Sequence, residues 1–165
     1  MSVNTTSTGS QDRLAVDVAL LVVRVIVGII FVVHGAQKLF GAFGGPGLAA
    51  MVQPPPNGMG LLGYPVTIGE FFGGLGLIVG FLCRFSAASL IVIMLGAIGL
   101  VHGQHGFFLG RSPTDTLATA GFEYNLALIG LLVPILIAGP GRFAIGRFLP
   151  LPKSAQTGRP ITVLE

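Results

Sequence analysis

Four long runs of apolar residues alternate with polar or glycine- and proline-rich segments along the chain. The runs cover about 14–38, 66–83, 85–102 and 119–138. Each has roughly the 17–25 residues that an α-helix needs to cross the hydrocarbon core of a bilayer. Apolar residues follow one another continuously, whereas strands of a membrane barrel alternate apolar with polar positions. The pattern predicts an all-α integral membrane protein whose domain, residues 14–148, is a bundle of four transmembrane helices.

The segments between the runs differ in kind. Residues 1–13 are rich in Ser and Thr and are predicted to be a disordered tail, and residues 149–165 form a second tail. The first run has no small-residue cleavage site after it, so we expect a retained helix and not a signal peptide. The second and third runs are joined by a tight hairpin. The link 41–65 contains GLAAMV, a predicted short interfacial helix, and the link 106–118 is an irregular loop.

Basic residues near the ends of the runs predict the orientation. With four spans, one side of the membrane holds six of them, Arg13, Arg84, Arg142, Arg147, Lys153 and Arg159. The opposite side holds two, Lys38 and Arg111. Lys and Arg are enriched on the cytoplasmic side of membrane proteins. We therefore expect both termini in the cytoplasm of a bacterial cell, the protein in its inner membrane, and the loops 41–65 and 106–118 facing the periplasm.

The composition agrees with a membrane protein and excludes other classes. Hydrophobic residues make up 52% of the chain and charged residues 9%, with a mean hydropathy of +0.87. Soluble domains carry roughly a quarter charged residues. The basic residues are too few and too scattered for a nucleic-acid surface. The single cysteine, Cys83, excludes an internal disulfide framework.

Seven polar or ionisable residues are predicted to gather at one end of the bundle. Because successive helices reverse direction, positions near the end of one run and the start of the next come to similar depth. This places the seven in the outer, periplasmic half. They are His34, Lys38, Glu70, His102, His105, Glu123 and Asn125.

Arg24 lies deeper on the first run. It precedes His34 by ten residues, about 15 Å along a helix, and it shares a helical face with Lys38. Ionisable groups near the bilayer centre usually face the bundle interior or a partner. We expect Arg24 to extend toward Glu70 or Glu123. Two structural alternatives stay open: a buried ion pair that only fixes helix register, and a Lys38 that extends to the interface.

The histidines allow a weaker metal hypothesis. His102 and His105 are three residues apart, so with His34 and a glutamate they can supply ligands. A pair with this spacing is a weak signal. Two interfacial histidines without metal are the simpler interpretation.

Short motifs in a fixed order along the runs resemble those of the DoxX family. They are R-x3-G-x2-F-x3-G-x2-K from Arg24 to Lys38, GEFFGGLGLIVGF into CRFSA, HG, FEYNLALIGLL and GPGRFAIGR. The resemblance covers about 14–148. It implies a four-helix bacterial inner-membrane protein linked to membrane redox chemistry, since relatives are described as subunits of a terminal quinol oxidase or thiosulfate:quinone oxidoreductase. The family's polar positions correspond here to Arg24, Lys38, Glu70, Glu123 and Asn125.

The sequence thus leads to two functional hypotheses. In the first, the protein is a quinone-interacting redox component. Arg24 or Lys38 polarises a quinone oxygen, and Glu70, Glu123 or a histidine exchanges protons. Other residues of the quinone site are Phe31, His34, Phe71, Tyr124 and Asn125.

No haem, flavin or iron–sulfur motif is recognisable, so an enzymatic role requires electrons from a partner subunit, expected to dock on the loops 41–65 and 106–118. In the second hypothesis, the protein is a non-catalytic membrane anchor or accessory subunit that stabilises a larger complex.

Overall fold

The structure, a computed structural model, describes residues 5–110 and 120–147. Two predicted segments therefore lie wholly or mostly outside the described residues: the tail 149–165 and the loop 106–118 with Arg111. The described chain is helical and contains no strand. Its main helices are α1 (Thr5–Phe40), α2 (Gly47–Met51), α3 (Gly63–Val79), α4 (Cys83–Ala97) and α5 (Glu123–Ala138).

Three of these helices are long and apolar enough to cross a membrane. Within the described residues they are Gln11–Phe40, Gly60–Val79 and Cys83–His105. The first lies in α1, the second contains α3 and the turn before it, and the third contains α4 and the turns after it. The fourth predicted span corresponds to α5, which is shorter at 16 residues. The prediction of a helical membrane protein is confirmed, with three long helices and one short apolar helix.

The ends of the helices refine the sequence prediction. α1 begins at Thr5, so residues 5–13, predicted to be disordered, are helical. The predicted helix in the first link is α2, and the predicted hairpin is the turn between Val79 and Cys83. Gly80 and Leu82 both adopt positive φ there, which reverses the chain within three residues. α4 continues into a π-helical turn, Ile98–His102.

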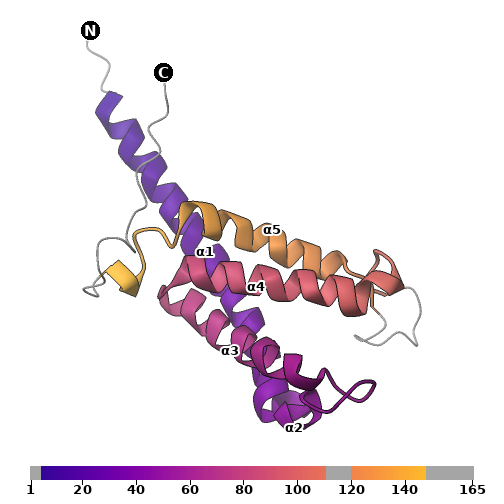
Figure 1. The fold of residues 1–165 in the computed structure, drawn as a ribbon. Coiled ribbons are helices and arrows are strands. Elements are labelled where there is room, and N and C mark those ends of the chain that lie inside the picture. Colours follow the sequence, from indigo (N-terminus) through magenta and orange to yellow (C-terminus); the bar gives the residue numbers. More distant parts are fainter. Residues whose placement is uncertain (1–4, 111–119, 148–165) are drawn as a thin grey trace.

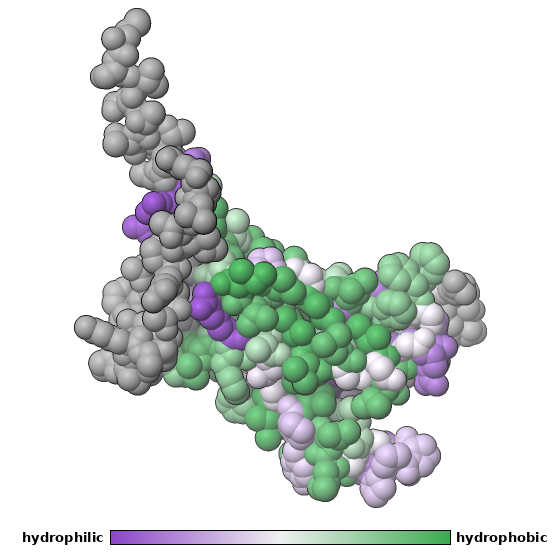
Figure 2. Space-filling view, turned by 45° about the horizontal axis from the view of Figure 1, so that its top comes forward, coloured by the Kyte–Doolittle hydropathy of each residue, from purple (hydrophilic) through white to green (hydrophobic). Residues whose placement is uncertain are grey.

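The helices pack as two crossing pairs. α1 lies mainly against α3, and α4 lies against α5 and α3. Figure 1 shows that the α4–α5 pair runs at a clear angle to α1, so the two pairs diverge. The buried core between them includes Val27, Phe31, Leu90 and Leu132. Figure 2 shows hydrophobic residues over most of one face, as expected for a surface in lipid.

Two glycines of α1 bring its backbone against α3. A Cβ atom at Gly28 would lie 2.6 Å from Cγ1 of Ile78 and 2.8 Å from the Gly74 carbonyl oxygen. A Cβ atom at Gly35 would overlap the backbone of Phe71. Small residues allow such close approach between helices in membranes. The register of α1 on α3 is therefore set by contacts that no larger residue allows.

A larger residue at this contact is expected to destabilise the bundle. Gly35→Ala should lower the free energy of unfolding by about 2 kcal/mol, because overpacking displaces the Phe71 backbone. Unfolding by SDS in mixed micelles measures this. Gly130→Ala is the matched control, since nothing lies within 4 Å of its Cβ position on α5. Equal stability of the two variants would contradict the close α1–α3 contact.

Candidate functional site

A salt bridge joins the last turn of α1 to α3. The Lys38 ammonium group donates hydrogen bonds of 2.6 Å to both carboxylate oxygens of Glu70. The Glu70 side chain is 3% exposed and that of Lys38 is 27% exposed. A charge-assisted, bidentate pair of this kind is a strong interaction. The pair therefore presents one accessible cation above a buried carboxylate.

The local sequence explains why this pair forms. Gly35 lies three residues before Lys38 and contacts the backbone of Phe71, the residue after Glu70. The close approach at Gly35 brings Glu70 against α1, where Lys38 reaches it. We name Lys38 and Glu70 together the Lys38–Glu70 site, and the end of the bundle that carries it the Lys38 end.

A hydroxyl group lies next to the site on α3. Thr67 is fully buried and precedes Glu70 by three residues, so the two share a helix face. Among the described residues its Oγ1 has no hydrogen-bond partner. An unsatisfied buried hydroxyl is costly, so Thr67 is an available donor or acceptor beside the salt bridge. Thr67 was not predicted from the sequence, although its spacing of three residues from Glu70 was a usable signal.

His34 connects the Lys38 end to α5. It lies one turn before Lys38, and its ring centroid is 6.3 Å from that of Tyr124, with an interplanar angle of 56°. Both side chains are half-buried. The structure thus brings His34, Lys38 and Glu70 to one end, with Tyr124 alongside.

Arg24 does not extend toward either glutamate, contrary to the prediction. Its guanidinium group donates to the carbonyl oxygens of Pro140 and Phe143, at 2.9 and 2.6 Å. It lies beside Gly80, at the α3–α4 turn. Lys38 is 14 residues away on α1, about 21 Å along the axis. Arg24 therefore belongs to the opposite end of the bundle and joins the segment after α5 to α1.

The polar residues of α4 and α5 make contacts of their own. Glu123 accepts a 2.7 Å hydrogen bond from the amide of Leu109, and His102 Nδ1 lies 2.8 Å from the Ala120 carbonyl oxygen. The Asn125 amide donates to Sδ of Met94 at 3.4 Å. These contacts hold the α4–α5 connection and the α4–α5 interface. The predicted gathering of all seven residues is thus only partly realised.

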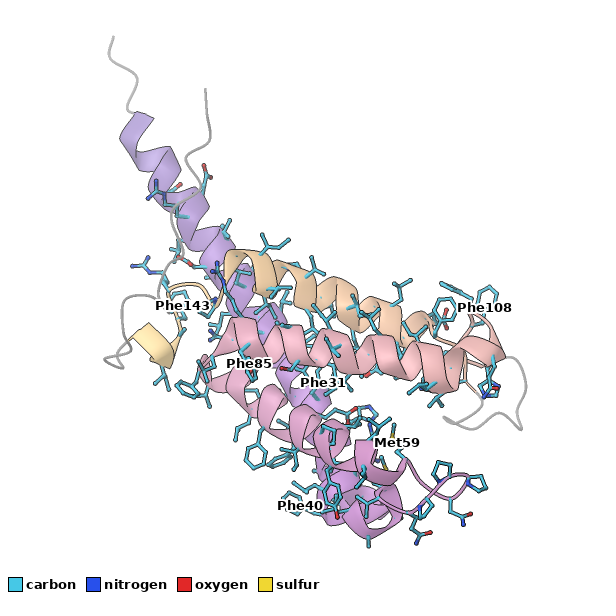
Figure 3. All side chains as sticks on the ribbon, viewed as in Figure 1. Phe31, Phe40, Met59, Phe85, Phe108 and Phe143 are labelled. Carbon is cyan, nitrogen blue, oxygen red and sulfur yellow. The ribbon has the colours of Figure 1, made fainter. Side chains whose placement is uncertain are left out.

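The aromatic residues of the predicted quinone site also separate. Phe31 is 1% exposed and belongs to the core. Phe71 is half-buried, and its ring makes edge-to-face contacts with Phe40 and Phe72, both at 5.2 Å. In Figure 3, Phe40 lies at the end of α1, Phe31 inside the bundle and Phe108 at the far end of α4 and α5. Phe71 follows Glu70 on α3 and Tyr124 contacts His34 at the Lys38 end, whereas Phe31 lies in the core.

The histidines are not arranged as a metal site. Within the described part of the chain, no three His, Cys, Asp or Glu side chains lie close enough together to hold a metal ion. His34 lies on α1 against Tyr124, whereas His102 and His105 lie in the helical turns that follow α4. The weaker metal hypothesis gains no support from this arrangement.

Comparison with known proteins assigns the chain to a family. The DoxX family model matches residues 19–103. The Inner membrane protein YqjF of Escherichia coli (strain K12) is 29% identical over 136 residues, which cover 81% of this chain and 93% of that protein. No solved structure matches the chain. The matched region contains α3, α4 and most of α1, including the Lys38–Glu70 site. The chain belongs to the DoxX family and is a multi-pass protein of the inner membrane.

Proposed function

We propose that this protein is a redox component of the inner membrane that binds a quinone head group at the Lys38–Glu70 site. The observation that carries the proposal is the salt bridge itself, in which a partly exposed ammonium group lies over a buried carboxylate. A charged pair inside an apolar bundle is costly and is by default a candidate functional site. A quinone is an apolar ring with two oxygen acceptors, so it suits a membrane site with few polar groups.

The side chains at the site match what a quinone needs. An ammonium group has three N–H donors, and two of those of Lys38 are directed at Glu70. The third can donate to a quinone oxygen and stabilise the negative charge that develops on reduction. Glu70 can exchange a proton with that oxygen. Phe71 and Phe40 lie alongside as apolar walls for the ring.

The electrons have to come from a partner subunit or directly from a substrate. We propose that a partner docks on the loop 41–65, which lies at the Lys38 end and on the periplasmic side in the predicted orientation. This loop exposes large apolar side chains, with Phe43 75% and Leu61 84% exposed. The loop 106–118 is the second docking candidate, and its described part exposes Phe108.

A binding assay tests the proposed head-group site. The purified protein in lipid nanodiscs should bind a short-chain benzoquinone, and Glu70→Gln should weaken binding about tenfold, as expected for about 1.4 kcal/mol of lost interaction. Quinone-dependent quenching of Tyr fluorescence or calorimetry measures the affinity. Arg84→Gln is the control, because Arg84 is exposed and bonds the Ile137 carbonyl oxygen near the end of α5. Equal affinity of all three proteins would refute the head-group site.

A non-catalytic accessory role is the second candidate. It is favoured by Arg24, Glu123 and Asn125, each of which makes a hydrogen bond to another part of the chain. Such contacts fix helix positions without involving a ligand. In this case Glu70→Gln lowers the amount of assembled complex, while turnover per assembled complex stays unchanged. Turnover and abundance measured on the same membranes distinguish the two candidates.

A further inference from the structure

The hydroxyl group of Thr67 is the unpaired polar group closest in sequence to Glu70. Thr67 is fully buried, and among the described residues its Oγ1 makes no hydrogen bond. Buried hydroxyl groups in helices often bond the carbonyl oxygen four residues before them. That carbonyl group belongs to Gly63 here, and the bond is not formed. Because an unpaired buried hydroxyl is costly, its position points to a hydrogen-bonding ligand.

The packing of α1 on α3 brings Thr67 to the last turn of α1. A Cβ atom at Gly35 would overlap the backbone of Phe71, so these two residues lie opposite each other. Because α1 ends and α3 begins at the Lys38 end, the two helices are antiparallel. Four residues along each helix from the Gly35–Phe71 contact, Leu39 and Thr67 therefore come to the same level on the facing sides.

The last turn of α1 supplies acceptors at this level. A helix leaves its last four carbonyl oxygens without partners inside the helix. No backbone amide of the described chain bonds the carbonyl oxygen of Lys38, Leu39 or Phe40, and Figure 3 shows Phe40 at this end of α1. The Glu70 carboxylate adds acceptor sites, because each of its oxygens has two lone pairs and accepts one hydrogen bond from Lys38.

The chemistry of these groups selects the ligand. The carboxylate and the carbonyl oxygens only accept hydrogen bonds, whereas the Thr67 hydroxyl group can also donate. A water molecule donates two hydrogen bonds and makes about three in total at buried sites. A monovalent cation also suits oxygen ligands, but the ammonium group of Lys38 already balances the charge of Glu70 and would repel it. A neutral donor is therefore the better fit.

We infer that a water molecule binds between Thr67, Glu70 and the last turn of α1. It accepts a hydrogen bond from Thr67 and donates one to Glu70 and one to the carbonyl oxygen of Leu39. The site goes beyond the proposed function and does not depend on a quinone. It also gives Glu70 a route to solvent at the Lys38 end that leaves the salt bridge intact. The water accepts a proton that arrives from solvent as it passes one of its own to the carboxylate.

Water-edited solid-state NMR of the full-length protein in lipid bilayers tests the site, with no quinone added. It measures how fast magnetisation passes from water to each side chain. The Cβ signal of Thr67, identified as the threonine signal that Thr67→Ser removes, should gain magnetisation several-fold faster than Leu77, which is fully buried on the same helix. The new serine keeps the hydroxyl group and should keep the fast transfer. Equal rates for Thr67 and Leu77 would overturn the inference.

The stability of Thr67→Val gives a second test, because the two cases differ in sign. With water bound, the substitution removes one of its partners, and the unfolding equilibrium constant should rise about tenfold. If the hydroxyl group is unpaired, its removal lowers that constant, which would overturn the inference. Unfolding in sodium chloride and in choline chloride at equal concentration detects a cation instead. Stabilisation by sodium that Thr67→Val abolishes would assign the site to a cation and exclude the water.

The outcome is separate from that of the proposed function. If the water is found but quinone affinity does not depend on Glu70, the water site stands and the head-group site fails. If quinone affinity depends on Glu70 but Thr67 receives no magnetisation from water, the reverse holds.

Discussion

Lys38→Met is expected to lower the free energy of unfolding by about 3 kcal/mol, more than any other single change at the salt bridge. The substitution leaves the carboxylate of Glu70, 3% exposed, without a counter-ion. Removing one partner of a buried salt bridge costs roughly 3–5 kcal/mol, because the charge of the other partner stays buried and unpaired. SDS-driven unfolding of the purified protein in mixed micelles measures the change.

Glu70→Gln is the matched control and should cost only about 1 kcal/mol. The amide oxygen still accepts from Lys38, and the ammonium group, already 27% exposed, can extend into water. In the double variant Lys38→Met/Glu70→Gln no charge remains, so it should be more stable than Lys38→Met alone. A larger effect of Glu70→Gln than of Lys38→Met would show that Glu70 is not the buried member of the pair.

Arg24→Leu is expected to destabilise the protein by a similar amount, about 3 kcal/mol, through the opposite end of the bundle. Arg24 is 1% exposed and donates to two carbonyl oxygens after α5. Hydrogen bonds from charged groups contribute roughly 1.5–3 kcal/mol each, and their loss also leaves the two carbonyl groups unsatisfied. The same unfolding assay measures the loss.

Hydrogen exchange shows whether the effect is local. The Arg142 amide donates to Asp17 on α1, and the Gly146 amide donates to the Gly80 carbonyl oxygen. Both amides should exchange faster in Arg24→Leu, while amides at the α1–α3 contact stay protected. Arg84→Leu is the control, since this exposed residue makes one bond to Ile137 and should cost under about 1 kcal/mol. Unchanged exchange at Arg142 and Gly146 would exclude Arg24 as the residue that holds this segment.

The helices were predictable because the membrane requires long apolar runs. The predicted and observed ends of α3 differ by three and four residues. The predicted hairpin is present, but its turn lies at residues 80–82, before the predicted link around Arg84, because Cys83 already begins α4. The helical start of α1 at Thr5 was missed, because residues 5–13 carry no apolar periodicity. Composition identifies a span in lipid but not the part of a helix that extends beyond it.

The site was predictable only where two neighbouring helices meet. Lys38 and Glu70 were placed at one end, and the structure joins them. The prediction then assumed that polar residues at a similar depth in the membrane, on four different helices, also lie close together. The α4–α5 pair diverges from α1 (Figure 1). Glu123 and His102 accordingly contact Leu109 and Ala120, in the connection between α4 and α5. Arg24 was misplaced for another reason. Its partners are backbone carbonyl oxygens, which leave no signature in a sequence.

The unequal lengths of the helices have a consequence for the surrounding bilayer. α1 has 36 residues and α5 has 16, which correspond to about 54 and 24 Å. The hydrocarbon core of a typical bilayer is about 30 Å thick. Lipids beside α5 therefore meet a hydrophobic wall about 6 Å too short, while lipids beside α1 meet one that is long enough to tilt. Thinning of the bilayer beside α5 can accommodate this mismatch, at a cost of fractions of a kcal/mol per ångström.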